Sequence, residues 1–123
     1  MKTVITIPTI GRTPAYSFDP DNKAQVCTLI RRANVLFRLS ARHWEKSNDS
    51  KIPADMRANH TAQEMRCAYE GSELLTPLGI QCDWPGLYPS FTGPTGHTFH
   101  DTRSAVLDAI ARPLNWIMPE DIY

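Results

Sequence analysis

Apolar side chains recur at every third or fourth position through residues 21–46, and neither proline nor glycine interrupts them. The stripe consists of Val26, Ile30, Ala33, Phe37, Ala41 and Trp44. This spacing puts one apolar side chain per turn on one face and predicts an amphipathic helix. Asp19 followed by Pro20 is typical of a helix start, with Asp19 as the N-cap and Pro20 at the first helical position. We expect this helix, about 39 Å long, to be the main support of the fold.

A different pattern precedes this helix. Residues 2–10 combine apolar and β-branched side chains and predict a first strand. Pro8 lacks a backbone N–H, so it places this strand at a sheet edge or ends it. Residues 11–18 contain a glycine and a proline and are expected to form a loop.

The segment after the long helix changes from polar to amphipathic. Residues 47–60 are mostly polar and predict a surface loop. Thr61 and Glu64 match a capping box, in which each side chain accepts a backbone N–H of the first turn. We therefore expect a second helix over residues 61–75. Its expected buried residues are Met65, Ala68, Tyr69, Ser72 and Leu75.

The last third of the chain predicts strands followed by one short helix. A strand is expected at residues 80–84, and residues 87–92 and 97–100 should pair as a hairpin around the turn 93–96. Asp101 or Thr102 should cap a third helix that ends near residue 112. The apolar tail that follows should dock on the rest of the protein.

Together these elements predict an α+β fold. One long central helix and two shorter helices would pack on a small, mainly antiparallel sheet. The chain of 123 residues has the length of one compact domain, so we expect a single domain over residues 1–123.

Composition narrows the class of protein. Hydrophobic residues make up 41% of the chain, and no run approaches the ~20 apolar residues that a membrane span needs. Pro8 interrupts the N-terminal apolar run before it reaches the length of a signal peptide. Three widely spaced cysteines are an odd number and do not indicate a disulfide framework. These features predict a cytoplasmic protein without a membrane association.

The net charge of zero conceals an uneven distribution of charge. Residues 1–46 carry eight Lys and Arg against three acids, a balance of +5, whereas residues 64–123 carry three against eight, a balance of −5. The two parts could attract each other within the fold, or a basic face could meet an acidic partner.

The basic excess includes a row of arginines. Helical spacing places Arg31, Arg38 and Arg42 on one face of the long helix. Guanidinium groups bind carboxylates and phosphates in bidentate fashion, so this row is a candidate partner-binding surface. The alternative is an ordinary solvated helix face.

An aromatic segment offers a second candidate surface. Trp84, Tyr88 and Phe91 lie close together in the sequence with two prolines between them. Large aromatic side chains on an ordered loop are typical of recognition surfaces. The alternative is that these side chains fill the core beneath the long helix.

Candidate metal ligands are sparse. Cys82, His97, His100 and Asp101 are the weak candidates. Residues 97 and 100 point to opposite faces of a strand, and Cys82 has no paired thiol nearby in the sequence, so we assign no metal site and no cofactor. The chain also contains neither a glycine-rich phosphate loop nor a nucleophile elbow, and no catalytic residue is assigned.

These observations favour a small non-enzymatic binding protein. We expect a regulator or inhibitor, of the kind that viruses and mobile elements encode, that contacts a protein partner with an acidic surface. One alternative is a nucleic-acid-binding protein that uses the arginine row. The other is a small metal-dependent hydrolase centred on residues 97–101. The sequence leaves the oligomeric state open.

Overall fold

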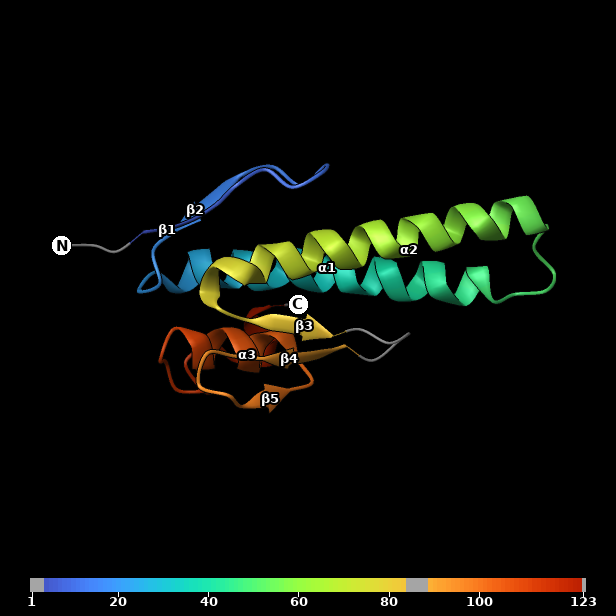
Figure 1. The fold of residues 1–123 in the computed structure, drawn as a ribbon. Helices are drawn as coiled ribbons and strands as arrows, with labels where there is room; N and C mark the ends of the chain where they lie inside the picture. The colour runs from blue at the N-terminus through green and yellow to red at the C-terminus, as the bar shows by residue number, and fades with distance from the viewer. Residues whose placement is uncertain (1–3, 84–88, 123) are drawn as a thin grey trace.

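The computed structural model of this chain describes residues 4–83 and 89–122, and it confirms the α+β class (Figure 1). Within these residues two long helices pack side by side, and a short helix and two small antiparallel sheets accompany them. The helices are α1 (Lys23–Ser47), α2 (Ala54–Leu75) and α3 (Thr102–Ala109). The strands are β1 (Ile5–Ile7), β2 (Tyr16–Phe18), β3 (Gln81–Asp83), β4 (Ser90–Thr92) and β5 (Thr98–Phe99). Two 3₁₀ turns are η1 (Thr76–Leu78) and η2 (Pro119–Asp121).

Helix α1 runs through the centre of the fold, as its apolar stripe predicts. Its cap differs from the expectation: the Asn22 side chain accepts the Gln25 N–H at 3.2 Å, so the helix begins at Lys23. The Asp19 carboxylate instead accepts the Asp21 N–H at 2.9 Å and closes a separate turn. Both residues are good caps, and the apolar periodicity does not distinguish between them.

Helix α2 begins seven residues before the predicted start. Pro53 takes the N-cap position, and its carbonyl accepts the Arg57 N–H at 2.9 Å. The capping box is therefore wrong: Thr61 lies inside the helix, where its hydroxyl donates to the Arg57 carbonyl at 3.2 Å. The first two turns of α2 have a mostly polar sequence, and such a composition is typical of a loop.

The expectation of burial is also wrong for two side chains of α2. Met65 is 62% exposed and Tyr69 is 55% exposed. Ala68 and Leu75 are buried as expected, and the buried residues of α2 also include Cys67, Gly71 and Leu74. Gly71 allows a close approach, since a Cβ there would lie 3.0 Å from the Phe37 ring.

The segment expected to be a loop at residues 11–18 contains strand β2. It pairs antiparallel with β1, and Ile5 lies opposite Phe18. Tyr16 stacks on Phe18 at 6.0 Å between ring centroids, and its hydroxyl donates to the Gln25 carbonyl at the start of α1. The Arg32 guanidinium covers the outer side of the Tyr16 ring. Strand β2 is too short to show a clear alternation of apolar and polar residues in the sequence. Its contacts with α1 stabilise it instead.

The turn between β1 and β2 is fixed by a buried carboxylate on α2. Glu70 is 1% exposed, and its Oε1 accepts the Arg12 N–H at 2.5 Å and the Thr13 N–H at 3.3 Å. Its other oxygen, Oε2, pairs with Arg66 at 2.5 Å. Gly11 has φ +53°, and a Cβ at this position would collide with the same carboxylate.

The C-terminal third largely follows the prediction. Strands β4 and β5 form the expected hairpin, and β3 pairs antiparallel with β4. Asp101 caps α3 by accepting the Ser104 N–H at 2.8 Å. The tail docks, as expected, because Ile117 and Ile122 are buried. Arg103 secures it by donating to the Ile117 carbonyl at 2.5 Å.

The core lies where the first half of α1 and the second half of α2 meet the strands. Figure 1 shows the β1–β2 sheet on one side of the helix pair and α3 with β3–β5 on the other. The far ends of α1 and α2 project beyond both sheets (Figure 1). None of the helices in the described ranges has the length and apolar character required to cross a membrane.

Candidate functional site

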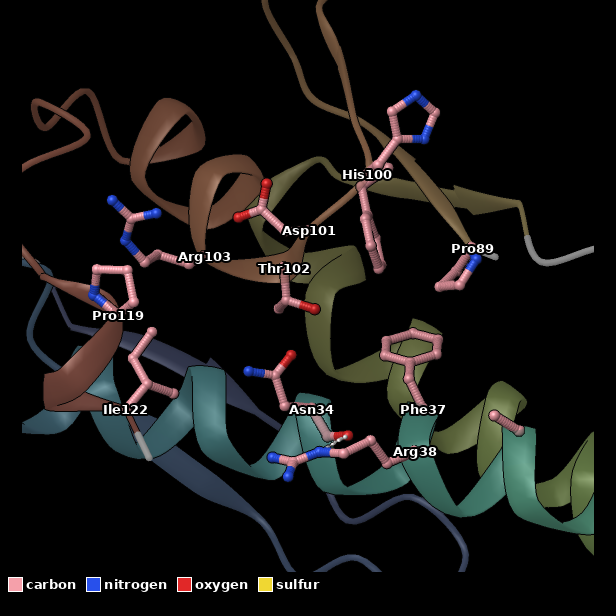
Figure 2. Close-up of a pocket in the computed structure, with 12 residues that line it drawn as sticks. Asn34, Phe37, Arg38, Pro89, His100, Asp101, Thr102, Arg103, Pro119 and Ile122 are labelled. Carbon is pink, nitrogen blue, oxygen red and sulfur yellow. Dashed lines mark hydrogen bonds between the residues drawn. The ribbon is translucent and has the colours of Figure 1, made fainter. Parts of the chain in front are cut away.

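A groove of about 500 Å³ lies between α1, strand β4, the start of α3 and the C-terminal tail (Figure 2). Its floor is apolar. Phe37 from α1 meets the edge of Phe91 from β4 at 5.3 Å between ring centroids. Pro89, Pro119 and Ile122 complete the apolar walls. The groove thus joins segments from the beginning, the middle and the end of the described chain.

The rim of the groove carries both signs of charge. Arg38 is exposed on α1, and its Nε donates to the Asn34 carbonyl at 3.4 Å. Arg103 and Asp101 line the opposite side, where Arg103 binds tail carbonyls and Asp101 caps α3. His100 stands at the edge, and its ring is turned away from Phe37 (Figure 2). Arg38 is therefore an exposed basic residue on the α1 side of the groove.

The structure separates the predicted arginine row into two parts. Arg31 binds the tail: its Nε donates to the Ile122 carbonyl at 3.0 Å and its Nη2 to the Asp121 carbonyl at 2.5 Å. Arg38 and Arg42 are exposed on α1, four residues apart, and Arg31 is exposed as well. The guanidinium of Arg31 is bound to the tail, which gives this residue a structural role.

One ion pair joins the excess charges of the two parts of the chain: Lys23 of the basic part pairs with Asp121 of the acidic part at 3.3 Å. A second pair, Arg112 with Asp21, joins the minority charge of each part. A hydrogen bond from the Met118 N–H, together with Lys23, lowers the pKa of the Asp121 carboxyl. Attraction between the two parts within the fold therefore explains part of the uneven charge distribution. This is one of the two interpretations that the sequence leaves open.

The aromatic candidates have a different outcome. Trp84 and Tyr88 lie outside the described residues. Phe91 is 1% exposed and packs on Phe37, because β4 directs it toward α1. The expectation that Phe91 projects toward a partner is corrected: this side chain fills the core and supports the floor of the groove.

The weak metal candidates do not converge. Cys82 is half-buried on β3, and burial raises the pKa of its thiol to about 11 despite a hydrogen bond with Ser72. His97 lies edge-on to Phe99, and the Asp101 carboxylate accepts the Ser104 N–H. Across residues 4–83 and 89–122, no group of three or more His, Cys, Asp or Glu side chains is arranged to hold a metal ion. The hydrolase alternative therefore gains no support from these side chains.

Sequence reasoning missed a pair of histidines at the far end of the helix pair. His43 on α1 and His60 on α2 approach to 2.9 Å between their Nδ1 atoms. The sequence pattern predicts a loop at His60 and a helix that begins at residue 61, whereas α2 begins at Ala54. Alignment of the two helices across their connection could have found the pair. Both histidines lie within two helical turns of this connection, so antiparallel helices bring them to the same level.

Comparisons with protein-family models, with curated proteins and with solved structures gave no match for this chain.

Proposed function

We propose that this protein is a small binding protein that acts through protein–protein contacts. The groove between α1, β4 and α3 would take an acidic segment of the partner. The observation that carries this proposal is an apolar groove with the exposed residue Arg38 at its rim and exposed Arg42 on the next turn of α1. We expect the protein to be a regulator or inhibitor, a role that requires binding of a partner and no catalysis.

The groove has the size and the surface of a recognition site. A volume of about 500 Å³ holds a few side chains, and the apolar lining that includes Phe37 and Ile122 favours an apolar one. Guanidinium groups bind carboxylates through two parallel hydrogen bonds. We therefore expect the partner segment to combine one buried apolar side chain with Asp or Glu on the side of Arg38 and Arg42.

Charge favours a protein partner over nucleic acid. The chain has no net charge. Proteins that follow a phosphate backbone usually carry a strongly basic surface. Two exposed arginines beside an apolar floor fit a short acidic peptide better.

Selection from a random-peptide library tests the proposal without a known partner. The expected result is enrichment of peptides with an apolar residue flanked by Asp or Glu. Arg38→Glu and Arg42→Glu should each weaken binding of a selected peptide by roughly tenfold or more, as loss of a charged hydrogen bond costs about 1.5–3 kcal/mol.

The matched control is Lys51→Glu. Lys51 is exposed in the connection between α1 and α2, so this variant makes the same charge change away from the groove. It should bind the selected peptide like the original protein. Peptides without acidic residues, or equal losses in all three variants, would contradict the proposal. Binding to random-sequence DNA that falls steeply with added salt would support the nucleic-acid alternative instead.

A further inference from the structure

Two imidazole rings face each other between α1 and α2. The Nδ1 atoms of His43 and His60 are 2.9 Å apart, and the ring centroids are separated by 5.2 Å at an interplanar angle of 32°. Both side chains are half-buried. When both rings are neutral, one Nδ1–H donates to the lone pair of the other Nδ1. The helices thus hold two ligand-type nitrogens together.

The surroundings of His43 disfavour the charged form of its imidazole. Burial lowers the pKa of His43 first, and His60, Lys46 and Arg66 lower it further through their positive charge. The neutral imidazole is the form that binds metal ions, because a protonated nitrogen has no lone pair to give. The positive charges of Lys46 and Arg66 also oppose a bound dication, so a strongly binding metal ion suits the pair best.

The distance between the nitrogens fits coordination to one ion. Metal–nitrogen bonds of about 2.0–2.1 Å place two nitrogens 2.9 Å apart at an angle of about 90° around the metal. That is the angle between neighbouring ligands in square-planar and octahedral complexes. A tetrahedral ion needs a separation of about 3.4 Å, which small rotations of the two side chains supply.

We propose that His43 and His60 form a two-imidazole binding site for a divalent transition-metal ion, with water molecules completing the coordination. Imidazole nitrogen suits Ni²⁺, Cu²⁺ and Zn²⁺, and Cu²⁺ binds most tightly of the three in the general order of affinities. On binding, the donor ring moves its proton from Nδ1 to Nε2. Both Nδ1 lone pairs then point to the ion, and no net proton is released from the neutral pair.

The cysteines do not compete for the ion. Burial raises the pKa of Cys27, Cys67 and Cys82, so their thiols stay protonated near neutral pH. Metal ions bind the thiolate form. An ion at the histidine pair would connect α1 to α2 beyond both sheets, where the two helices project from the rest of the fold (Figure 1). Such an ion would stabilise the native helix pair through linkage.

Titration of the full chain with Zn²⁺ tests this proposal, since Zn²⁺ does not oxidise thiols. Calorimetry should show one ion per chain. His43→Ala and His60→Ala should each lower the association constant by roughly tenfold or more, because loss of a ligand exceeds the usual effect of changing its supporting groups. The matched control is the double variant of His97 and His100 to Ala, which also removes two imidazoles and should bind Zn²⁺ normally.

Histidine ring NMR of the unchanged protein provides a second measurement that does not depend on how the variants fold. Addition of Zn²⁺ should shift the ring nitrogens of His43 and His60 and leave those of His97 and His100 in place. The proposal is overturned by an absence of Zn²⁺ binding, by shifts at His97 or His100 in place of the pair, or by binding that survives His43→Ala in a folded protein.

Discussion

Glu70 offers the sharpest test of how this fold is held together. Its buried carboxylate accepts the backbone N–H groups of Arg12 and Thr13 and pairs with Arg66. Replacing Glu70 with Ala removes the acceptor from both backbone groups and leaves the β1–β2 turn without its link to α2. We expect the β1–β2 sheet to loosen from α2 and the protein to lose stability.

The magnitude follows from the contacts. A hydrogen bond to a charged group contributes about 1.5–3 kcal/mol, and breaking a buried pair by removing one partner costs about 3–5 kcal/mol. The Arg66 side chain is about one-third exposed, so solvent screens the ion pair and reduces its share. We therefore expect Glu70→Ala to lower the free energy of unfolding by about 3 kcal/mol. Glu70→Gln keeps an acceptor oxygen and should cost about half as much.

Urea unfolding followed by circular dichroism measures both changes. The control is Glu73→Ala, which removes a carboxylate from the same helix and should change the free energy of unfolding by less than about 0.5 kcal/mol. If Glu70→Ala cost no more than Glu73→Ala, the carboxylate would not be what fixes the turn. The reasoning would also fail if Glu70→Gln were as destabilising as Glu70→Ala.

Three further predictions concern other parts of the molecule. Gly11→Ala should lower the melting temperature more than Gly96→Ala: both glycines have positive φ, but a Cβ meets the Glu70 carboxylate at Gly11 and has nothing within 4 Å at Gly96. The lowered pKa of His43 means that the unfolded chain binds protons more readily, so stability should fall as pH drops through about 6.5 and below. Melting curves from pH 8 to 5 should show this fall, and His43→Gln should reduce it. The raised pKa of Cys82 should make its thiol react slowly with iodoacetamide at pH 8 in the native protein and much faster in urea, and equal rates would contradict its burial.

The sequence predicts those elements whose residues make most of their contacts locally. The stripe of α1, the β4–β5 hairpin and the Asp101 cap of α3 all follow from spacing and turn chemistry. The start of α2 does not, because its first turns project beyond the sheets and keep a polar composition. Strand β2 was missed because it has three residues and depends on the contacts of Tyr16 and Phe18 with distant groups.

The candidate site also combines features that local sequence predicts with features that depend on distant contacts. Helical periodicity is enough to place Arg38 and Arg42 at the surface of α1. The role of Arg31 depends on carbonyls about 90 residues away in the tail, which no local pattern reveals. The approach of His43 and His60 depends on the register between two helices, and an error of seven residues in the start of α2 hides it.

The C-terminal tail forms part of the groove, so the shape of the groove depends on whether the tail stays docked. Pro119 and Ile122 form part of its wall, and hydrogen bonds from Arg31 to the Asp121 and Ile122 carbonyls hold that wall in place. Local detachment of the tail would open the groove on one side, so tail fraying and ligand affinity are thermodynamically linked. A ligand in the groove should protect the amides of the tail from hydrogen exchange. Weakening the Arg31 contacts should reduce affinity even though Arg31 does not line the groove. Under the proposed function, the fraction of molecules with a docked tail would therefore set how tightly the groove binds its partner.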